Sequence, residues 1–225
     1  MSLAAELWAA TSEQAQAALE HPFVRGLAQG SLDTDLFKRY ILQDAFFLDA
    51  FARAYALALA RCPDREGMRA FFTLLGGVLD ELRLHASYAA RWGAADALET
   101  LVPAPATLAY TDFLLATAAL GSVGETCAAM TPCMRLYAYL GQSLARAGAD
   151  RETNPYAEWV RTYAAADFED LAATLERLLD RYGSPTPAVQ AAYARAMQLE
   201  VAFFEAASQP VQAPTGSGAA RCTSE

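Results

Sequence analysis

Apolar residues recur every three or four positions along most of the chain, and short runs of glycine, proline and small polar residues separate these periodic segments. This spacing puts the apolar residues on one face of a helix, as in amphipathic helices that pack around a shared core. No segment alternates apolar and polar residues as a half-buried strand does. The pattern predicts an all-α, single-domain helical bundle over residues 1–208. Residues 209–225 are rich in proline, glycine and serine, and we expect a flexible C-terminal tail there.

Capping residues and prolines set the expected helix boundaries. The first helix is expected over residues 3–19, and His21-Pro22 opens a shorter second one. Asn154-Pro155 and Thr186-Pro187 each carry the signature of a polar N-cap followed by proline, which predicts two further helix starts. The other expected helices cover residues 33–61, 64–92, 106–120 and about 125–148.

Two carboxylates fall on apolar helix faces. Asp44 continues the stripe that includes Tyr40, Phe47 and Phe51, and Glu200 falls on the apolar face of the last helix. An unpaired charge in a core costs several kcal/mol, so each carboxylate must find a partner or take up a proton. Each either pairs with a group inside the bundle or marks a functional site, where such groups gather.

Glu81 and His85 are four residues apart on another apolar face. This spacing suits metal ligation, and it equally suits an ordinary hydrogen bond between the two side chains. A catalytic metal usually needs three or more protein ligands, and the sequence offers only His21 as a second imidazole. We therefore expect no metal.

Cys133 follows Pro132 at a predicted helix start or kink. Backbone dipoles at such a position can lower the pKa of a thiol, although a buried cysteine is more commonly inert. Several aromatic residues, including Tyr110, Tyr137 and Tyr163, are compatible with either a core or a binding site.

The composition excludes several function classes. The 225-residue chain carries a net charge of −9, and Lys38 is its only lysine, so it lacks the basic surface that nucleic acids require. Its longest nearly apolar run is about ten residues, short of the roughly 20 that span a membrane. With no recognisable signal peptide, its four cysteines are expected to be reduced thiols in the cytoplasm.

Taken in order, several segments of this sequence resemble the TenA family, the thiaminase II or aminopyrimidine aminohydrolase group, which has a heme-oxygenase-like helical fold. The segments that carry the resemblance span nearly the whole chain apart from the tail. They are His21-Pro22-Phe23-Val24, residues 40–47, residues 81–85, Ala109-Tyr110-Thr111, Pro132-Cys133 with Tyr137, Tyr156 with Trp159 and Tyr163, and Glu200 with Phe203-Phe204. The cysteine matters most, because one branch of the family lacks it.

The resemblance implies a hydrolase of aminomethylpyrimidines in thiamine salvage that needs no cofactor, with thiamine as a second candidate substrate. Cys133 is then the nucleophile that adds to the pyrimidine ring, Asp44 holds the ring nitrogen and amino group, and Glu200 is general acid and then base. The positions expected to stack on the ring or bind its edge are Phe47, Tyr110, Tyr137 and Tyr163.

The same resemblance leaves two other functions open. One is a pyrimidine-binding or regulatory protein without catalysis, and the other is a non-haem iron enzyme that uses Glu81 and His85. It also implies a homotetramer. Where the family usually carries aromatic residues after the cysteine, this chain has Met134-Arg135, and Arg135 is expected at a subunit interface or at the rim of the pocket.

Overall fold

The computed structural model describes residues 1–91, 93, 97 and 100–208, and every regular element within them is an α-helix. The predicted tail at 209–225 lies outside the described residues. The helices are α1 (Leu3–Ala10), α2 (Ser12–Glu20), α3 (Pro22–Gln29), α4 (Thr34–Arg61), α5 (Arg65–Arg91), α7 (Pro105–Leu120), α8 (Val123–Arg146), α9 (Ala157–Ala164), α10 (Ala166–Tyr182) and α11 (Pro187–Ser208).

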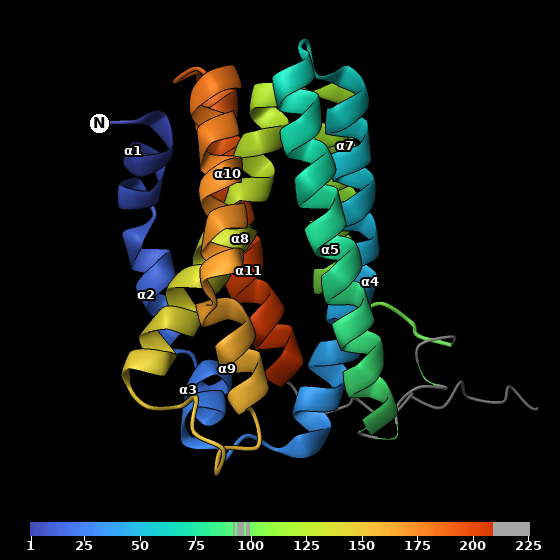
Figure 1. Cartoon of the computed structure of the whole chain (residues 1–225), viewed down its shortest axis with the longest axis vertical. Coiled ribbons are helices and arrows are strands. Elements are labelled where there is room, and N and C mark those ends of the chain that lie inside the picture. The colour runs from blue at the N-terminus through green and yellow to red at the C-terminus, as the bar shows by residue number, and fades with distance from the viewer. Residues whose placement is uncertain (92, 94–96, 98–99, 209–225) are drawn as a thin grey trace, which may run out of the picture.

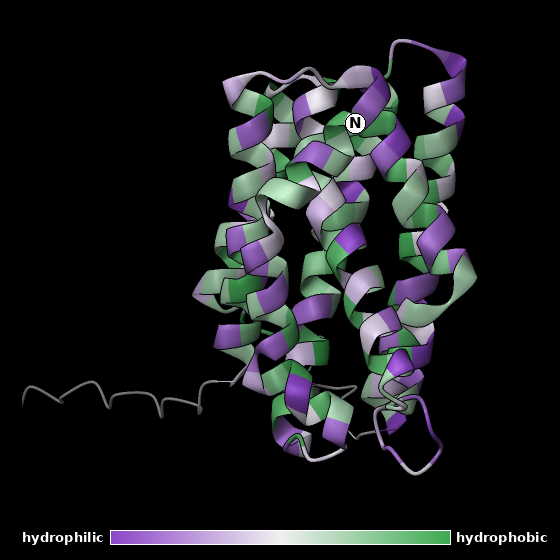
Figure 2. Ribbon diagram, turned by 90° about the vertical axis from the view of Figure 1, so that its left-hand side faces the viewer, coloured by the Kyte–Doolittle hydropathy of each residue, from purple (hydrophilic) through white to green (hydrophobic). Residues whose placement is uncertain are grey.

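The long helices stand side by side as an upright bundle (Figure 1). α4 packs against α5 and α7, while α8 packs against α9, α10 and α11. α8 is the central element, since 16 of its 24 residues are buried. Most helices carry both hydrophilic and hydrophobic residues along their ribbons (Figure 2), as expected for amphipathic helices around one core. No described helix has the length and apolar character needed to cross a membrane.

Most predicted boundaries are confirmed. Asp33 caps α4 by accepting hydrogen bonds from the backbone N–H groups of Asp35 and Leu36. The side-chain oxygen of Thr186 likewise accepts from the backbone N–H of Val189 at the start of α11. These short polar side chains satisfy backbone donors that have no partner within the first turn.

The prediction of one helix over 3–19 is wrong, because the chain breaks at Thr11 into α1 and α2. The Thr11 hydroxyl donates to the backbone carbonyl of Leu7 at 3.0 Å. A threonine hydroxyl that bonds the preceding turn competes with the helix for its own carbonyls, which favours a break.

The helix predicted to open at Asn154-Pro155 begins instead at Ala157. The Asn154 side-chain amide donates to the backbone carbonyls of Leu27 and Ala149, and its oxygen accepts from the N–H of Tyr156. Asn154 therefore ties the segment before α9 to α3, and the helix starts two residues later than predicted.

Candidate active site

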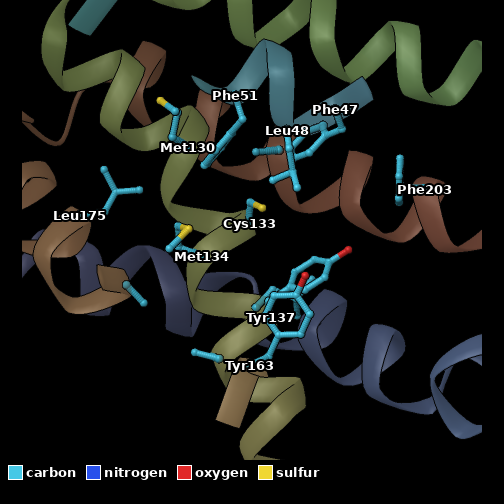
Figure 3. Packing of buried hydrophobic residues seen from close by; sticks show 14 of the residues in the cluster. Phe47, Leu48, Phe51, Met130, Cys133, Met134, Tyr137, Tyr163, Leu175 and Phe203 are labelled. Carbon is cyan, nitrogen blue, oxygen red and sulfur yellow. The ribbon is translucent and has the colours of Figure 1, made fainter. Parts of the chain in front are cut away.

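Three helices bring the predicted reacting groups into one buried cluster. Asp44 comes from α4, Cys133 from α8 and Glu200 from α11, and their residues are only 4%, 8% and 2% exposed. Figure 3 shows Cys133 on α8 between Phe47 on one side and Tyr137 and Tyr163 on the other. The periodicity that placed both carboxylates on apolar faces is thus confirmed.

Glu200 interacts with side chains from two other helices. The Tyr110 hydroxyl donates to its Oε1 at 2.6 Å, and the Cys133 thiol lies close enough for the two groups to influence each other's pKa. Burial raises the pKa of Glu200 to about 8, and Tyr110 and Cys133 oppose that rise. A carboxyl with this pKa can take and return protons near neutral pH, as a general acid and base must.

Cys133 is in a different setting from the one predicted. α8 is continuous from Val123 to Arg146, so Pro132 and Cys133 lie in its interior and not at a helix start. Burial raises the pKa of the Cys133 thiol well above its usual value, and the negative charge of Glu200 adds to the rise. Of the two possibilities that the sequence left open, the structure favours the buried thiol over one with a lowered pKa, because Cys133 lies within the helix and buried carboxylates raise its pKa. The thiol must pass its proton to a base before it can act as a nucleophile.

Asp44 is paired with His85, a partner 41 residues further along the chain on α5. His85 Nε2 lies 2.7 Å from Asp44 Oδ2, and Nδ1 lies 3.0 Å from the backbone carbonyl oxygen of Glu81. A carbonyl only accepts, so Nδ1 carries a proton, and one further proton must lie between Nε2 and Oδ2. Either the imidazole is charged beside a carboxylate, or it is neutral beside a carboxylic acid.

This pair keeps its shared proton at neutral pH. Burial lowers the pKa of His85, but the hydrogen bond and charge of Asp44, reinforced by Glu81, outweigh burial and raise the pKa to about 9. The Asp44–His85 pair therefore holds one exchangeable proton in the buried cluster that contains Cys133. Sequence reasoning had considered a side-chain hydrogen bond between Glu81 and His85, whereas the bond runs to the Glu81 backbone.

The Glu81 side chain instead accepts a hydrogen bond from the Tyr163 hydroxyl at 2.6 Å. Burial raises the pKa of Glu81 to about 7. Ligand atoms of Asp44, Glu81 and His85 lie within 4.8 Å of one another, so these are the described residues that could hold a metal ion. Ligation by His85 Nε2 would have to replace its bond to Asp44. His21 takes no part, because its Nδ1 caps α3 by accepting from the N–H of Phe23.

Aromatic rings enclose the reacting groups. The rings of Phe47 and Tyr110 are 4.7 Å apart between centroids, and those of Tyr137 and Tyr163 are 4.8 Å apart. All four predicted aromatic positions therefore lie at the cluster. Such rings offer a flat heteroaromatic molecule stacking surfaces, while the few polar groups between them fix its orientation.

Sequence reasoning missed a second layer behind these rings. Trp159 Nε1 donates to the Tyr40 hydroxyl, which donates to the Tyr137 hydroxyl, each at 3.2 Å. Tyr40 and Trp159 both lie on apolar faces, so their periodicity signals only burial. Their polar atoms become informative once the helices are placed together.

A comparison with protein families matches the TENA/THI-4/PQQC family over residues 8–209, nearly the whole chain. The chain belongs to the TENA/THI-4/PQQC family. Its architecture agrees with this membership, because TenA structures share the heme-oxygenase-like helical fold found here. A solved structure from a Silicibacter species, described as a TenA family transcription regulator, superposes with a TM-score of 0.84 at 28% identity. That match covers 92% of this chain and 96% of the other.

Two of the curated relatives are similar to this chain over most of its length. An aminopyrimidine aminohydrolase from Halalkalibacterium halodurans is 37% identical over 182 residues, which cover 80% of this chain and 81% of the relative. The bifunctional TH2 protein, mitochondrial, of Arabidopsis thaliana is 35% identical over 239 residues. Those residues cover 95% of this chain but only 38% of that longer protein.

Arg135, two residues after Cys133, binds carboxylates of α10. Its guanidinium binds Glu169 at 2.8 Å and Glu176 at 2.7 Å, both on α10. The Arg135 guanidinium therefore belongs to an ion-pair cluster that joins α8 to α10 within one chain, and its position at a subunit interface or at the pocket rim stays a prediction. The positive guanidinium is stabilised by these two negative carboxylates, whereas the apolar surroundings of the thiol offer it no such partner.

Proposed function

We propose that this protein hydrolyses aminopyrimidines, converting 4-amino-5-aminomethyl-2-methylpyrimidine and water into the 5-hydroxymethyl product and ammonia in thiamine salvage. The observation that carries the proposal is the buried cluster in which the Cys133 thiol, the Glu200 carboxylate and Asp44 lie together, enclosed by aromatic rings. The curated relatives named aminopyrimidine aminohydrolase, at 28–37% identity, support hydrolase activity.

In the proposed reaction Glu200 first takes the proton of the Cys133 thiol, and the sulfur adds to an electrophilic carbon of the pyrimidine ring. The ring nitrogen takes up a proton as its electron density rises, and we assign this proton to the one shared between Asp44 and His85. Addition costs the ring its aromaticity and makes it electron-rich, so that it can expel the substituent on its methylene group.

Glu200 next gives its proton to the departing amine, and the bond between the methylene carbon and nitrogen breaks. Water adds to the exposed methylene carbon and loses a proton to Glu200. The ring nitrogen then returns its proton to Asp44 and His85, the sulfur leaves as a thiolate, and it takes back a proton from Glu200, which restores the thiol and the carboxylate. Tyr110 holds the Glu200 carboxylate in place, while Phe47, Tyr137 and Tyr163 bind the ring. Thiamine, which carries a larger leaving group on the same methylene, is a second proposed substrate.

The test is to incubate the purified protein with 4-amino-5-aminomethyl-2-methylpyrimidine and to measure ammonia and the hydroxymethyl product. We expect both to appear in equal amounts and with multiple turnovers. Product formation no faster than in a protein-free control would contradict the proposed function.

We also propose that the protein is a homotetramer. Met68, Phe72 and Leu79 lie on one solvent-facing side of α5 and are 41%, 69% and 47% exposed. Exposed apolar side chains gathered on one helix face are typical of a subunit interface. Light scattering should give about four times the 24.2 kDa mass of the chain, and Phe72→Glu should lower that mass. A monomeric mass for the unaltered protein would contradict the proposal.

The cytoplasm is the proposed location, and a small molecule, not nucleic acid, is the proposed partner. Cys62, Cys127 and Cys133 are free thiols, which suits a reducing compartment. The net charge of −9 opposes binding to DNA. A gel-shift at physiological salt should show no complex, and tight DNA binding would favour the regulatory alternative.

A further inference from the structure

Three polar side chains behind the site have no role in the proposed reaction: Glu81, Tyr40 and Trp159. Each is hydrogen-bonded, directly or through one other hydroxyl, to a tyrosine that lies at the reacting groups. These tyrosines are Tyr163 and Tyr137, which are only 2% and 4% exposed. Their rings lie side by side in Figure 3, with centroids 4.8 Å apart. The contacts from behind set the direction in which each of these two hydroxyls can hydrogen-bond.

Glu81 takes up the proton of Tyr163. The Tyr163 hydroxyl donates to Glu81 Oε1 at 2.6 Å. An ionised carboxylate has no proton to give, so this hydrogen bond runs only from the phenol to the carboxylate. Burial raises the pKa of Glu81 to about 7, so the carboxyl group is mostly ionised at pH 8.5. Because a phenol carries a single proton, Tyr163 then meets a molecule in the site only with the lone pairs of its oxygen.

Trp159 gives Tyr137 the opposite character. An indole N–H group only donates, and the Tyr40 oxygen accepts from Trp159 Nε1 at 3.2 Å. The Tyr40 proton goes to the Tyr137 oxygen, also at 3.2 Å. Within the described part of the chain, no hydrogen bond uses the proton of Tyr137 itself. Tyr137 therefore donates into the site, while Tyr163 accepts.

The acceptor lies at the end of the site where the proposed reaction puts the amino group of the pyrimidine. A carboxylate oxygen of Glu81 lies within 4.8 Å of the ligand atoms of Asp44 and His85. Tyr163 is bonded to Glu81, so its oxygen lies near the Asp44 side chain, which is proposed to hold a ring nitrogen and the amino group. The amino group has two hydrogens, and Asp44 needs only one of them.

An aminopyrimidine has the hydrogen-bonding groups that these two tyrosines require. Its ring nitrogens accept, as a partner of Tyr137 must, and its amino group donates, as a partner of Tyr163 must. A 4-oxopyrimidine has a carbonyl oxygen in place of the amino group, and this oxygen would face the lone pairs of Tyr163. Two buried acceptors without a donor are unfavourable, because both have given up their hydrogen bonds to water. The arrangement favours the amino compound over the oxo compound.

We propose that Glu81 is a positioning residue that holds the proton of Tyr163, keeps the Tyr163 oxygen as an acceptor for the substrate amino group, and so selects 4-aminopyrimidines over 4-oxopyrimidines. The inference rests on the proposed hydrolysis of aminopyrimidines and adds the residue that enforces the choice of ring. Glu81 acts through Tyr163 and not on the ring itself.

The side chain of Glu81 can be changed with little change of shape. In Glu81→Gln the amide both donates and accepts, so Tyr163 is able to turn its proton toward a carbonyl oxygen in the site. Asp80→Asn is the matched control, because it removes a carboxylate from the neighbouring position of α5, where Asp80 pairs with Arg83. Glu81→Met, which keeps the length and removes the carboxylate, takes the place of Glu81→Gln if that variant folds poorly.

The experiment measures binding by calorimetry at pH 8.5. The two ligands are 4-amino-5-hydroxymethyl-2-methylpyrimidine and its 4-oxo counterpart, neither of which carries a leaving amine. We expect the unaltered protein to prefer the amino compound and Glu81→Gln to lower this preference at least fivefold, mainly through tighter binding of the oxo compound. Asp80→Asn should keep the preference within twofold. A smaller change in Glu81→Gln, or an equal change in Asp80→Asn, would overturn the inference.

A double-mutant comparison tests whether Glu81 acts through Tyr163. In a Tyr163→Phe background the hydroxyl is absent, so adding Glu81→Gln should change the preference less than twofold. A fivefold loss of preference in both backgrounds would overturn the inference, because it would assign the effect to the charge of Glu81 alone. Neither ligand needs to react. If the protein releases no ammonia while the preference and its dependence on Glu81 hold, the proposed hydrolysis fails and the positioning role stands.

Discussion

Removing the Tyr110 hydroxyl should shift the pH dependence of catalysis without removing any reacting group. Burial raises the pKa of Glu200 to about 8, and the hydrogen bond from Tyr110 opposes that rise. In Tyr110→Phe the opposing bond is lost, so the pKa of Glu200 should rise further. Because the Glu200 carboxylate must accept the thiol proton of Cys133, less of the enzyme is then competent at neutral pH.

The size of the effect follows from the strength of the bond. A hydrogen bond to a charged group is worth about 1.5–3 kcal/mol, and one pKa unit corresponds to about 1.4 kcal/mol. The acidic limb of kcat/KM, which reports the free enzyme, should therefore move from about pH 8 to roughly pH 9–10. At pH 7 the ionised fraction of Glu200, and with it kcat/KM, should fall roughly 10- to 100-fold.

The assay is ammonia release at low substrate concentration from pH 6 to 10. Tyr193→Phe is the matched control: it removes the same atom from another buried tyrosine, whose hydroxyl has no hydrogen-bond partner among the described residues. The control profile should match that of the unaltered protein. An acidic limb in Tyr110→Phe that stays in place or moves to lower pH would refute the role given to Glu200.

Two further predictions concern stability. Arg135→Leu should lower the free energy of unfolding by about 1–3 kcal/mol, since it removes the positive partner of the partly exposed Glu169 and Glu176. The same variant should leave kcat/KM unchanged. Urea unfolding and ammonia release measure the two quantities, and a large loss of kcat/KM in a folded variant would contradict this placement of Arg135. Folding raises the pKa of Glu200 from 4.5 to about 8 and that of His85 from 6.5 to about 9, so the folded state binds these protons more tightly than the unfolded state. The free energy of unfolding should therefore fall as pH rises from about 4.5 to about 9. The urea midpoint should therefore be lower at pH 9 than at pH 6, and Glu200→Gln should reduce the decline below pH 8; a midpoint that rises with pH would refute this assignment.

Sequence periodicity could identify Asp44 and Glu200 as buried because it depends only on neighbouring residues of one helix. It could not identify their partners, which lie on other helices: His85 is 41 residues from Asp44, and Tyr110 is 90 residues from Glu200. A helical pattern fixes which face of a helix is buried but not which helix covers it. The shared proton of Asp44 and His85 therefore emerges only from the assembled bundle.

The errors in the predicted helix boundaries have a related origin. Within the helix expected over about 125–148, local rules disfavour Pro132, since proline removes a backbone hydrogen bond at a cost of about 3 kcal/mol. In α8, the most buried helix, packing on all sides offsets that cost, and the helix continues through the proline. At Asn154 the opposite happens, because contacts with distant carbonyls take the side chain away from its expected capping role.

The proposal that Cys133 is the nucleophile is tested most directly by comparing Cys133→Ala with Cys127→Ala. Both cysteines are buried free thiols on α8, so the two variants make the same chemical change in one helix. The account predicts that Cys133→Ala loses release of ammonia from 4-amino-5-aminomethyl-2-methylpyrimidine while still binding the pyrimidine, and that Cys127→Ala retains it. Ammonia release by Cys133→Ala at the rate of the unaltered protein would contradict the account.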